Sequence, residues 1–190
     1  MDKKRCGWCV GDPLYELYHD TEWGVPVHKD QLLFEFLILE TFQAGLSWIT
    51  ILRKRENFRK AFDQFDYEKI AAYGELKTRS LLDNAGIVRN KLKINAAVTN
   101  ARAFIKIRQE FDTFDRYIWS FVDRKPIVNQ WQHYKDAPAN TSLSDTISKD
   151  LKKRGFKFVG STVVYAFMQA IGMVNDHEVD CFRYQEVQLL

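Results

Sequence analysis

The sequence predicts an all-α protein. Apolar residues recur at helical spacing through most of the chain, and no stretch alternates apolar and polar residues clearly enough to predict a strand. Asp, Ser and Pro stand where helices would begin, and Gly stands where they would end. These observations indicate a single domain, residues 1–190, built from packed helices.

The first predicted helix begins at Asp12-Pro13, because Asp is a favourable N-cap and Pro fits the first helical position. It carries Tyr15, Tyr18 and His19, which helical geometry turns toward different neighbours. The Trp-Gly-Val-Pro segment at 23–26 predicts a turn after it.

The second predicted helix, about 30–42, leaves almost no polar face and should be buried on most sides. Its interior charges, Glu35 and Glu40, project about 140° apart, so at least one of them must lie near the core. Ser47 is a suitable cap for a third helix from Trp48 to about residue 62. Glu40 and Trp48 are therefore expected to meet at one corner.

The remaining segments are also predicted as helices, apart from the loop at 123–141, which contains two prolines. Gly155 ends the segment after that loop, and two further glycines bracket a buried apolar helix near the C-terminal end. The predicted helices are 65–73, 77–83, a long helix after Gly86, 111–122, 142–154 and 160–172.

The stretch at about 81–97 predicts a helix, a tight turn at Gly86 and a second helix. Cations are disfavoured at a helix N-terminus, yet three crowd the start of the second helix, which suggests an external anion gripped by free N–H groups. A helix-hairpin-helix bound to DNA phosphate fits this pattern, and so does an ordinary helical hairpin with a solvated face. The DNA-binding residues predicted on the first interpretation are Gly86, Ile87, Val88, Arg89, Lys91 and Lys93.

Composition sets broad limits on function. A net charge of +3 permits nucleic-acid binding without requiring it. The N-terminus lacks the apolar run of a signal peptide, and the longest apolar stretch, 161–174, is too short to span a bilayer. Three cysteines without a secretory signal predict reduced thiols, so we expect a cytoplasmic protein that does not bind membranes.

Cysteine and histidine spacing raises the possibility of a metal site. His177 and Cys181 are four positions apart, which would place both on one face of a helical turn. Cys6 and His19 would complete a two-Cys, two-His zinc site that joins residues 1–20 to 174–185, with Cys9 and His28 as rival ligands. Two buried thiols and two core histidines explain the same residues. Four protein ligands would leave no position for water, so such a zinc ion would be structural.

Aromatic residues gather in the first quarter of the chain, near Glu40. Some must simply belong to the core, but several polar-tipped rings near a semi-buried carboxylate also predict a slot for a flat, electron-poor ring. Burying an unpaired carboxylate costs several kcal/mol, so Glu40 needs an arginine or a cationic ligand. The rings are Trp8, Tyr15, Tyr18, Trp23 and Trp48.

Motifs spread over nearly the whole chain resemble, in order, the 3-methyladenine-DNA glycosylase I family. They lie at 6–8 (Cys-Gly-Trp), 12–15, 18–20, 22–26, 39–40, 43–50 (Gln-Ala-Gly-Leu-Ser-Trp-Ile-Thr), 53–57, 85–89, 119–122, 151–160, 174–177 and Cys181. The resemblance implies a helix-hairpin-helix glycosylase of base excision repair that removes 3-methyladenine from alkylated double-stranded DNA. Its N- and C-terminal regions would be joined by one structural zinc ion.

Carried over by position, the resemblance assigns the zinc ligands to Cys6, His19, His177 and Cys181, the base-contacting carboxylate to Glu40, and the base pocket to Trp8, Tyr15, Tyr18 and Trp48. We expect Glu40 to be the catalytic residue, and the enzyme to be a monomer that hydrolyses the bond without cutting the strand. The chain departs from the wider pattern at Thr41, in having one hairpin glycine, and in having no Asp between 91 and 107.

Two other functions are compatible with parts of this pattern. A zinc-stapled helical module that binds DNA without catalysis would need the same hairpin and basic residues, and only Glu40 among the aromatic rings favours an enzyme over it. A catalytic zinc hydrolase is disfavoured by the closed set of four ligands.

Overall fold

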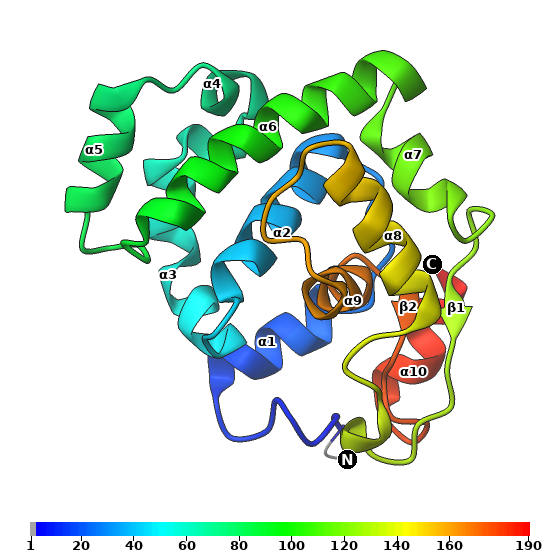
Figure 1. Ribbon diagram of the computed structural model, residues 1–190. Coiled ribbons are helices and arrows are strands. Elements are labelled where there is room, and N and C mark those ends of the chain that lie inside the picture. Colours follow the sequence, from blue (N-terminus) through cyan, green and yellow to red (C-terminus); the bar gives the residue numbers. More distant parts are fainter. Residues whose placement is uncertain (1–2) are drawn as a thin grey trace.

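The structure is a computed structural model that describes residues 3–190 (Figure 1). Helices dominate it, as predicted. They are α1 (Pro13–Thr21), α2 (Asp30–Gln43), α3 (Trp48–Ala61), α4 (Tyr67–Ala71), α5 (Glu75–Asp83), α6 (Lys91–Phe111), α7 (Phe114–Ser120), α8 (Ser142–Lys153), α9 (Ser161–Ala170) and α10 (Phe182–Glu186). Short 3₁₀ turns cover Asp63–Phe65, Tyr134–Asp136 and Val187–Leu189, and the strands are β1 (Ile127–Val128) and β2 (Val174–Asn175).

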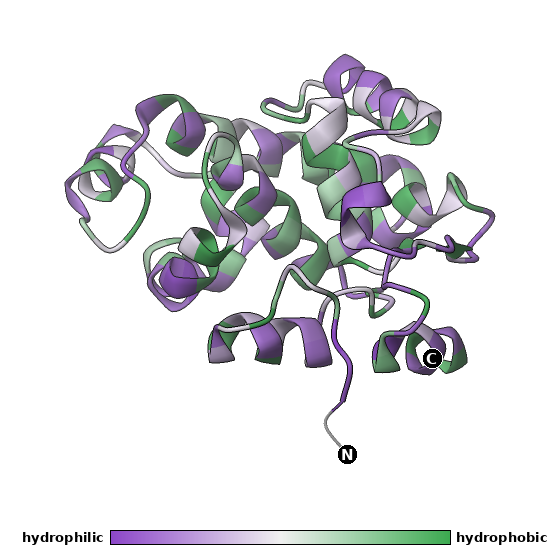
Figure 2. Ribbon diagram, turned by 90° about the horizontal axis from the view of Figure 1, so that it is seen from below, coloured by the Kyte–Doolittle hydropathy of each residue, from purple (hydrophilic) through white to green (hydrophobic). Residues whose placement is uncertain are grey.

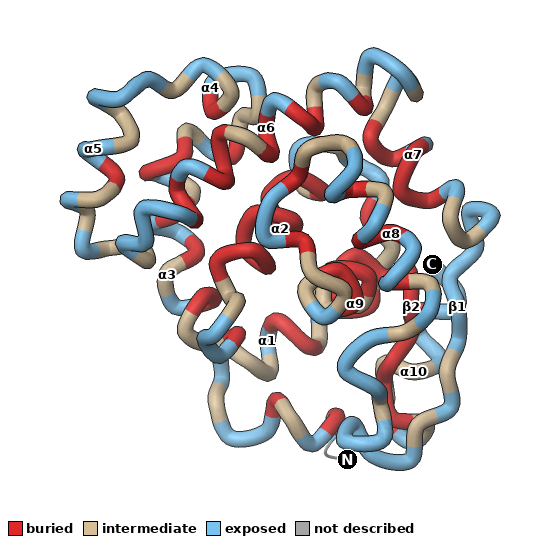
Figure 3. The backbone as a smooth tube through the Cα atoms, viewed as in Figure 1, coloured by how far each residue is buried: buried red, intermediate tan, exposed pale blue. Residues whose placement is uncertain are grey.

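Helix α2 forms the centre of the fold, because its sequence offers no polar face to solvent. It packs against α3, α6, α7 and α9, and Figure 3 shows α2 and α9 buried along most of their length. In Figure 2, apolar residues gather on the inward sides of the surrounding helices and polar residues on the outward sides. None of the helices in 3–190 combines the length and apolar character that a membrane crossing requires.

The structure differs from the predicted elements in two places along the middle of the chain. The loop at 123–141 contributes β1, which pairs in parallel with β2 through Ile127 N–H to Met173 O at 2.9 Å. Strands of two residues are too short for an alternating pattern to appear in the sequence. The predicted helix at 111–122 begins instead at Phe114, because Asp112 adopts a φ of 73° and the Thr113 side chain caps the new helix.

The predicted helical turn that carries His177 and Cys181 is wrong. Residues 176–181 are not helical: Glu178 forms an isolated β-bridge with Trp131, a turn follows, and α10 begins only at Phe182, with Cys181 as its N-cap. The segment is held by tertiary contacts instead: Phe182 N–H donates to Lys4 O at 2.9 Å, and Gly7 N–H donates to the Glu178 carboxylate at 3.2 Å. These bonds fasten the region after β2 to the region before α1.

Candidate active site and metal centre

A cavity of about 230 Å³ lies between α1, the C-terminal end of α2, the start of α3, and α9. All five residues predicted for the base pocket and its carboxylate line it, so the structure brings together what the sequence places far apart. The lining residues are Trp8, Tyr15, Tyr18, Trp23, Glu40, Gln43, Trp48, Tyr134, Ala137, Ala166, Gln169 and Asp176.

Ring-to-ring contacts make the aromatic wall of this cavity continuous. Trp8 lies edge-on to Tyr15, with ring centroids 4.8 Å apart, and Trp23 contacts its other side at 5.0 Å. Tyr18 links this group to Trp48, with centroids 5.5 Å apart. Rings held by one another keep their faces at fixed angles, so the cavity is preorganised for a flat ligand.

Glu40 is the unusual group in the cavity. It is 3% exposed, and its Oε2 atom has no hydrogen-bond partner among the described residues. Glu35 is also buried, but Arg55 and Arg59 each donate to it at 2.7 Å. Burial raises the pKa of Glu40 to about 8, since nothing nearby compensates its charge. The Nε1 atom of Trp48 is likewise buried without a partner among the described residues, so the cavity wall contains a buried acceptor and a buried donor that are both free.

Asp176 is a second buried carboxylate in the wall, and it is fully hydrogen-bonded. It accepts from the side chains of Asn129, Trp131, Tyr165 and Gln169 at 2.6–2.8 Å. These bonds fasten the 129–137 segment to α9, and that segment brings Tyr134 and Ala137 to the cavity. Asp176 therefore fixes the position of one wall.

Three of the four predicted metal ligands lie close together. The Sγ atoms of Cys6 and Cys181 and a ring nitrogen of His19 all fall within 4.8 Å of one another, and all three residues are buried. The ring of the fourth, His177, is fully buried with its centroid 5.1 Å from that of His19. Its Nε2 atom has no partner among the described residues, as expected of a nitrogen that serves a metal ion.

The groups behind these ligands favour metal binding. His19 Nδ1 is 2.8 Å from Asp20, which Arg5 holds in turn, and His177 Nδ1 is 3.0 Å from Asn175 Oδ1. Such bonds on Nδ1 leave Nε2 available as a ligand. Burial also lowers the pKa of His177 to about 3, which keeps its ring neutral. A zinc ion held by these four residues would supply cross-linking and no open coordination position.

Glycine at position 24 makes room for the His177 ring. Its φ is +77°, and a Cβ built there would lie 2.6 Å from His177 Cε1. Any larger residue would therefore strain the backbone and displace the histidine.

The two rival ligands are engaged elsewhere. Cys9 is buried, and its thiol donates to the Cys6 carbonyl oxygen at 3.2 Å. His28 is half-exposed, 2.6 Å from the Asp115 carboxylate, and its ring is tilted by 37° against that of Trp119, with centroids 4.6 Å apart. Neither belongs to the cluster of groups that could hold a metal.

The connection between α5 and α6 forms a tight turn whose carbonyl oxygens face inward. Lys54 Nζ donates to Ala85 O at 3.3 Å, and Asn57 donates to Gly86 O at 3.3 Å. The N–H groups of Val88 and Arg89 have no acceptor among the described residues. The turn thus presents donors outward, next to the free N–H groups that begin α6.

Two details of the predicted hairpin are corrected. Lys93 is not available to a phosphate, because its side chain is buried and its ammonium donates to Phe42 O at 2.9 Å and to Ala44 O. The sequence showed only a positive charge near the start of a helix. It did not show that the side chain of Lys93 turns inward, toward the C-terminal end of α2. Gly86 does not end the preceding helix, because α5 already ends at Asp83. A glycine is needed there for space and not for a left-handed φ, since a Cβ at this position would lie 3.2 Å from the Asn57 side chain.

Comparison with known proteins agrees with this geometry. The sequence model described as methyladenine glycosylase matches residues 8–184. The chain belongs to the methyladenine glycosylase family. It is 52% identical over 181 residues to DNA-3-methyladenine glycosylase 1 of Escherichia coli, covering 95% of this chain and 97% of that protein. The corresponding protein of Haemophilus influenzae is 48% identical over 177 residues, covering 93% and 96%.

Solved structures of 3-methyladenine DNA glycosylase I have the same fold as this methyladenine glycosylase family member. One is 51% identical, with a TM-score of 0.92 that covers 94% of this chain and 98% of that one. A second, a variant solved in complex with 3-methyladenine, is 37% identical, with a TM-score of 0.91 over 94% of this chain and 96% of that one.

Some wall residues of this family member were not predicted as site residues. Trp23 carried a signal, because it belongs to the aromatic group near the N-terminus. Tyr134 lies in a segment predicted as loop, and Asp176 was visible only as the neighbour of a metal ligand. The placement of Tyr134 and Asp176 depends on the pairing of β1 with β2 and on the side-chain bonds of Asp176, which the local sequence does not encode.

The raised pKa of Glu40 predicts how the stability of this family member depends on pH. The folded state holds a proton that the unfolded carboxyl, with a pKa of 4.5, releases. This contribution to stability is complete below pH 4.5 and is lost as the pH rises through about 8. Glu40→Gln should remove that loss, so its stability relative to the wild type should increase over this range.

Urea unfolding at several pH values between 4.5 and 8 measures the difference directly. Glu35→Gln is the matched control, because it removes the partner of Arg55 and Arg59 and should destabilise the protein. Parallel stability curves for wild type and Glu40→Gln would contradict the assignment of a raised pKa.

Proposed function

We infer that the chain is a DNA glycosylase that hydrolyses the N-glycosidic bond of 3-methyladenine in alkylated DNA, a step of base excision repair. The observation that carries this inference is the buried carboxylate of Glu40, whose Oε2 atom has no partner in the described part of the chain and which lines an aromatic cavity. A cationic, flat base supplies both the charge that Glu40 needs and the surface that the rings need. The names of the relatives, and the 3-methyladenine complex of one of them, support the same substrate.

The chemistry follows from the substrate. Methylation at N3 makes the adenine cationic, so the glycosidic bond is already weakened and the base leaves without prior protonation. Tyr15, Tyr18 and Trp48 stabilise the cationic ring by about 1–2 kcal/mol each when desolvated. Glu40 accepts a hydrogen bond from the adenine amino group and stabilises the positive charge. Neutral adenine gains neither benefit, which is the source of selectivity.

The reaction we propose is simple hydrolysis, without cleavage of the strand. A lyase needs an amine nucleophile, and the cavity lining within residues 3–190 includes no lysine. Lys93 is committed to two carbonyl oxygens of the α2 terminus. The nucleotide must leave the base stack to reach the cavity, as in other enzymes that act on bases within a duplex.

The surroundings of the site complete the proposal. Cys6, His19, His177 and Cys181 hold one structural zinc ion, and the hairpin with Arg89 and Lys91 holds phosphates of double-stranded DNA. We propose that the enzyme acts as a monomer in the cytoplasm, where its free thiols stay reduced.

Incubation with methylated duplex DNA, followed by chromatography of the released bases, tests the proposed function. We expect free 3-methyladenine and an intact strand containing abasic sites. Binding without release would favour the zinc-stapled DNA-binding module, and metal-dependent cutting of the strand would favour the hydrolase.

The phosphate contacts predict a specific salt dependence. Log affinity for duplex DNA should fall linearly with log salt, and Lys91→Gln should reduce the slope by about 0.9, the value for one lost phosphate contact. Lys93→Gln should leave the slope unchanged and lower the melting temperature, because it removes the bonds to the α2 terminus. Fluorescence anisotropy across a salt series measures both. Equal slopes for Lys91→Gln and wild type would contradict the contact.

A further inference from the structure

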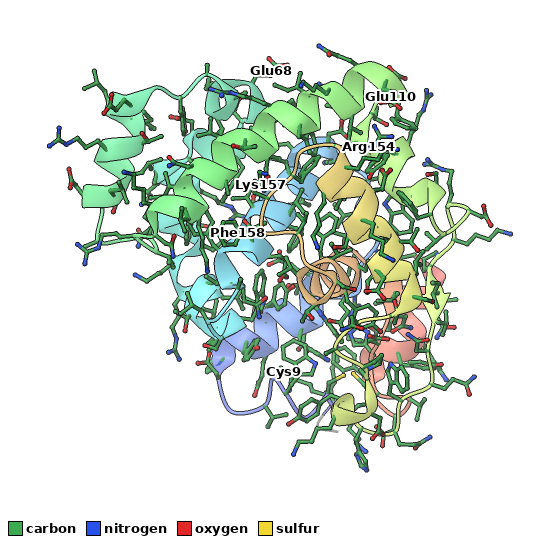
Figure 4. All side chains as sticks on the ribbon, viewed as in Figure 1. Cys9, Glu68, Glu110, Arg154, Lys157 and Phe158 are labelled. Carbon is green, nitrogen blue, oxygen red and sulfur yellow. The ribbon has the colours of Figure 1, made fainter. Side chains whose placement is uncertain are left out.

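An open hollow of about 330 Å³ lies beside the N-terminal half of α6, apart from the aromatic cavity. Leu92, Ala96 and neighbouring polar residues of α6 form one side, and Lys157 and Phe158 form the other. Figure 4 labels the latter two residues between α6 and α9, on the connection between α8 and α9. Leu92 is 68% exposed and Phe158 is 39% exposed, so the hollow presents apolar surface to solvent.

The fold holds Phe158 in this position at a conformational cost. Its φ is 56°, in the left-handed region that a bulky side chain rarely adopts. The buried side chain of Asn100 fixes the residue before it from both sides: it accepts from Lys157 N–H at 2.7 Å and donates to Lys157 O at 3.1 Å. A backbone strained and clamped in order to expose an aromatic ring indicates a surface that contacts a ligand.

The hollow adjoins the two parts of the molecule assigned to DNA. Leu92 follows the hairpin directly, as the second residue of α6. The ammonium of Lys93, the next residue, donates to the carbonyl oxygens of Phe42 and Ala44. These two residues follow Glu40 within about one helical turn. The first turn of α6, which carries Leu92, therefore lies between the hairpin and the C-terminal end of the helix that carries Glu40.

The charges around the hollow select the partner. Arg89, Lys91 and Lys157 are exposed, and none forms an ion pair within the described part of the chain. Apolar surface flanked by unpaired cations suits a polyanion with apolar components, and DNA offers phosphates beside deoxyribose and base edges. A second copy of this chain would bring the same positive charge and would be repelled.

We propose that Leu92 and Phe158 form an apolar DNA-contact surface, packing on deoxyribose and base edges of the duplex while Lys157 binds a flanking phosphate. The assignment rests on the proposed function and extends its DNA-binding surface beyond the hairpin. Phe158 is a binding residue that does not touch the reacting base, so its effect is confined to the affinity for duplex DNA.

The test uses a labelled duplex that carries a stable tetrahydrofuran abasic-site analogue, with binding followed by anisotropy. Phe158→Gly removes the ring and suits the left-handed backbone, so it should weaken binding about tenfold without lowering the melting temperature. The slope of log affinity against log salt should stay unchanged for this variant, whereas Lys157→Gln should reduce it by about 0.9. Phe158→Tyr should bind like wild type.

Two controls separate DNA contact from general damage. Free 3-methyladenine, titrated against tryptophan fluorescence, should bind Phe158→Gly as it binds wild type, because the aromatic cavity is separate. Leu189→Ala removes an 86% exposed apolar side chain elsewhere and should change nothing.

Duplex affinity of Phe158→Gly within twofold of wild type would overturn the proposal, and so would a parallel loss of free-base binding. Self-association of wild type that disappears in Phe158→Gly, with DNA affinity unchanged, would assign the hollow to a second copy and also overturn it. Failure of the wild type to release any base would instead refute the proposed function. Failure of the function and failure of the contact surface therefore give different results.

Discussion

Glu40→Gln is expected to reduce excision of 3-methyladenine by about 100-fold or more while the protein stays folded. The substitution preserves the shape and volume of the side chain but removes the negative charge that the carboxylate carries when a cationic base is bound. The aromatic walls persist, so the base still fits, but the positive charge loses the one unpaired acid that lines the cavity within residues 3–190. Single-turnover rates on methylated duplex DNA, measured well below the melting temperature, give the effect on the chemical step.

Glu35→Gln serves again as the control for this experiment. Both glutamates lie buried on α2, but Glu35 is neutralised by Arg55 and Arg59. We expect it to lower stability and leave the excision rate nearly unchanged, the opposite of Glu40→Gln. Full excision activity in Glu40→Gln would refute the assignment of the pocket.

Cys181→Ala is expected to eliminate stoichiometric zinc and to lower the melting temperature by about 10 °C or more. Structural zinc supplies a large part of the folding free energy in domains that it cross-links, and removing one thiolate opens the site. Cys181 belongs to the C-terminal segment and lies close to Cys6 in the N-terminal segment. Loss of the metal ion should therefore loosen both segments. Elemental analysis and thermal unfolding provide the two readouts.

Cys9→Ala is the matched control, since Cys9 is also a buried, free cysteine, only three positions from Cys6. Its thiol donates to a carbonyl oxygen and lies outside the group formed by Cys6, His19 and Cys181, so zinc content should be kept and stability should fall only slightly. Purified wild-type protein without zinc, with Cys6 and Cys181 open to a thiol reagent, would eliminate the proposed metal centre.

Much of the fold could be predicted from the sequence because its signals are local. Asp12 caps α1, as predicted, and the pattern of 32–39, apolar except for Glu35, identifies the buried centre. Where tertiary contacts decide, the prediction was wrong. The turn at 176–181 has helical spacing of ligands but is shaped by bonds to Lys4 and Gly7.

The part of the site that could be predicted from the sequence is the part in which the chemistry of one residue requires a particular kind of neighbour. The need of Glu40 for compensation pointed to an aromatic cavity, and the structure places the predicted rings around it. Lys93 illustrates the opposite case. Its charge suggested solvent and phosphate, but the orientation of its side chain depends on where α2 ends, and that is a property of the packed fold.

The proposed metal ligands come from positions 6, 19, 177 and 181, so the site would assemble only when distant parts of the chain have already docked. Ion capture would therefore be among the last events of refolding. If Co²⁺ replaces zinc during refolding, the rise of its visible absorption, which responds to tetrahedral thiolate coordination, would report the time at which the site assembles.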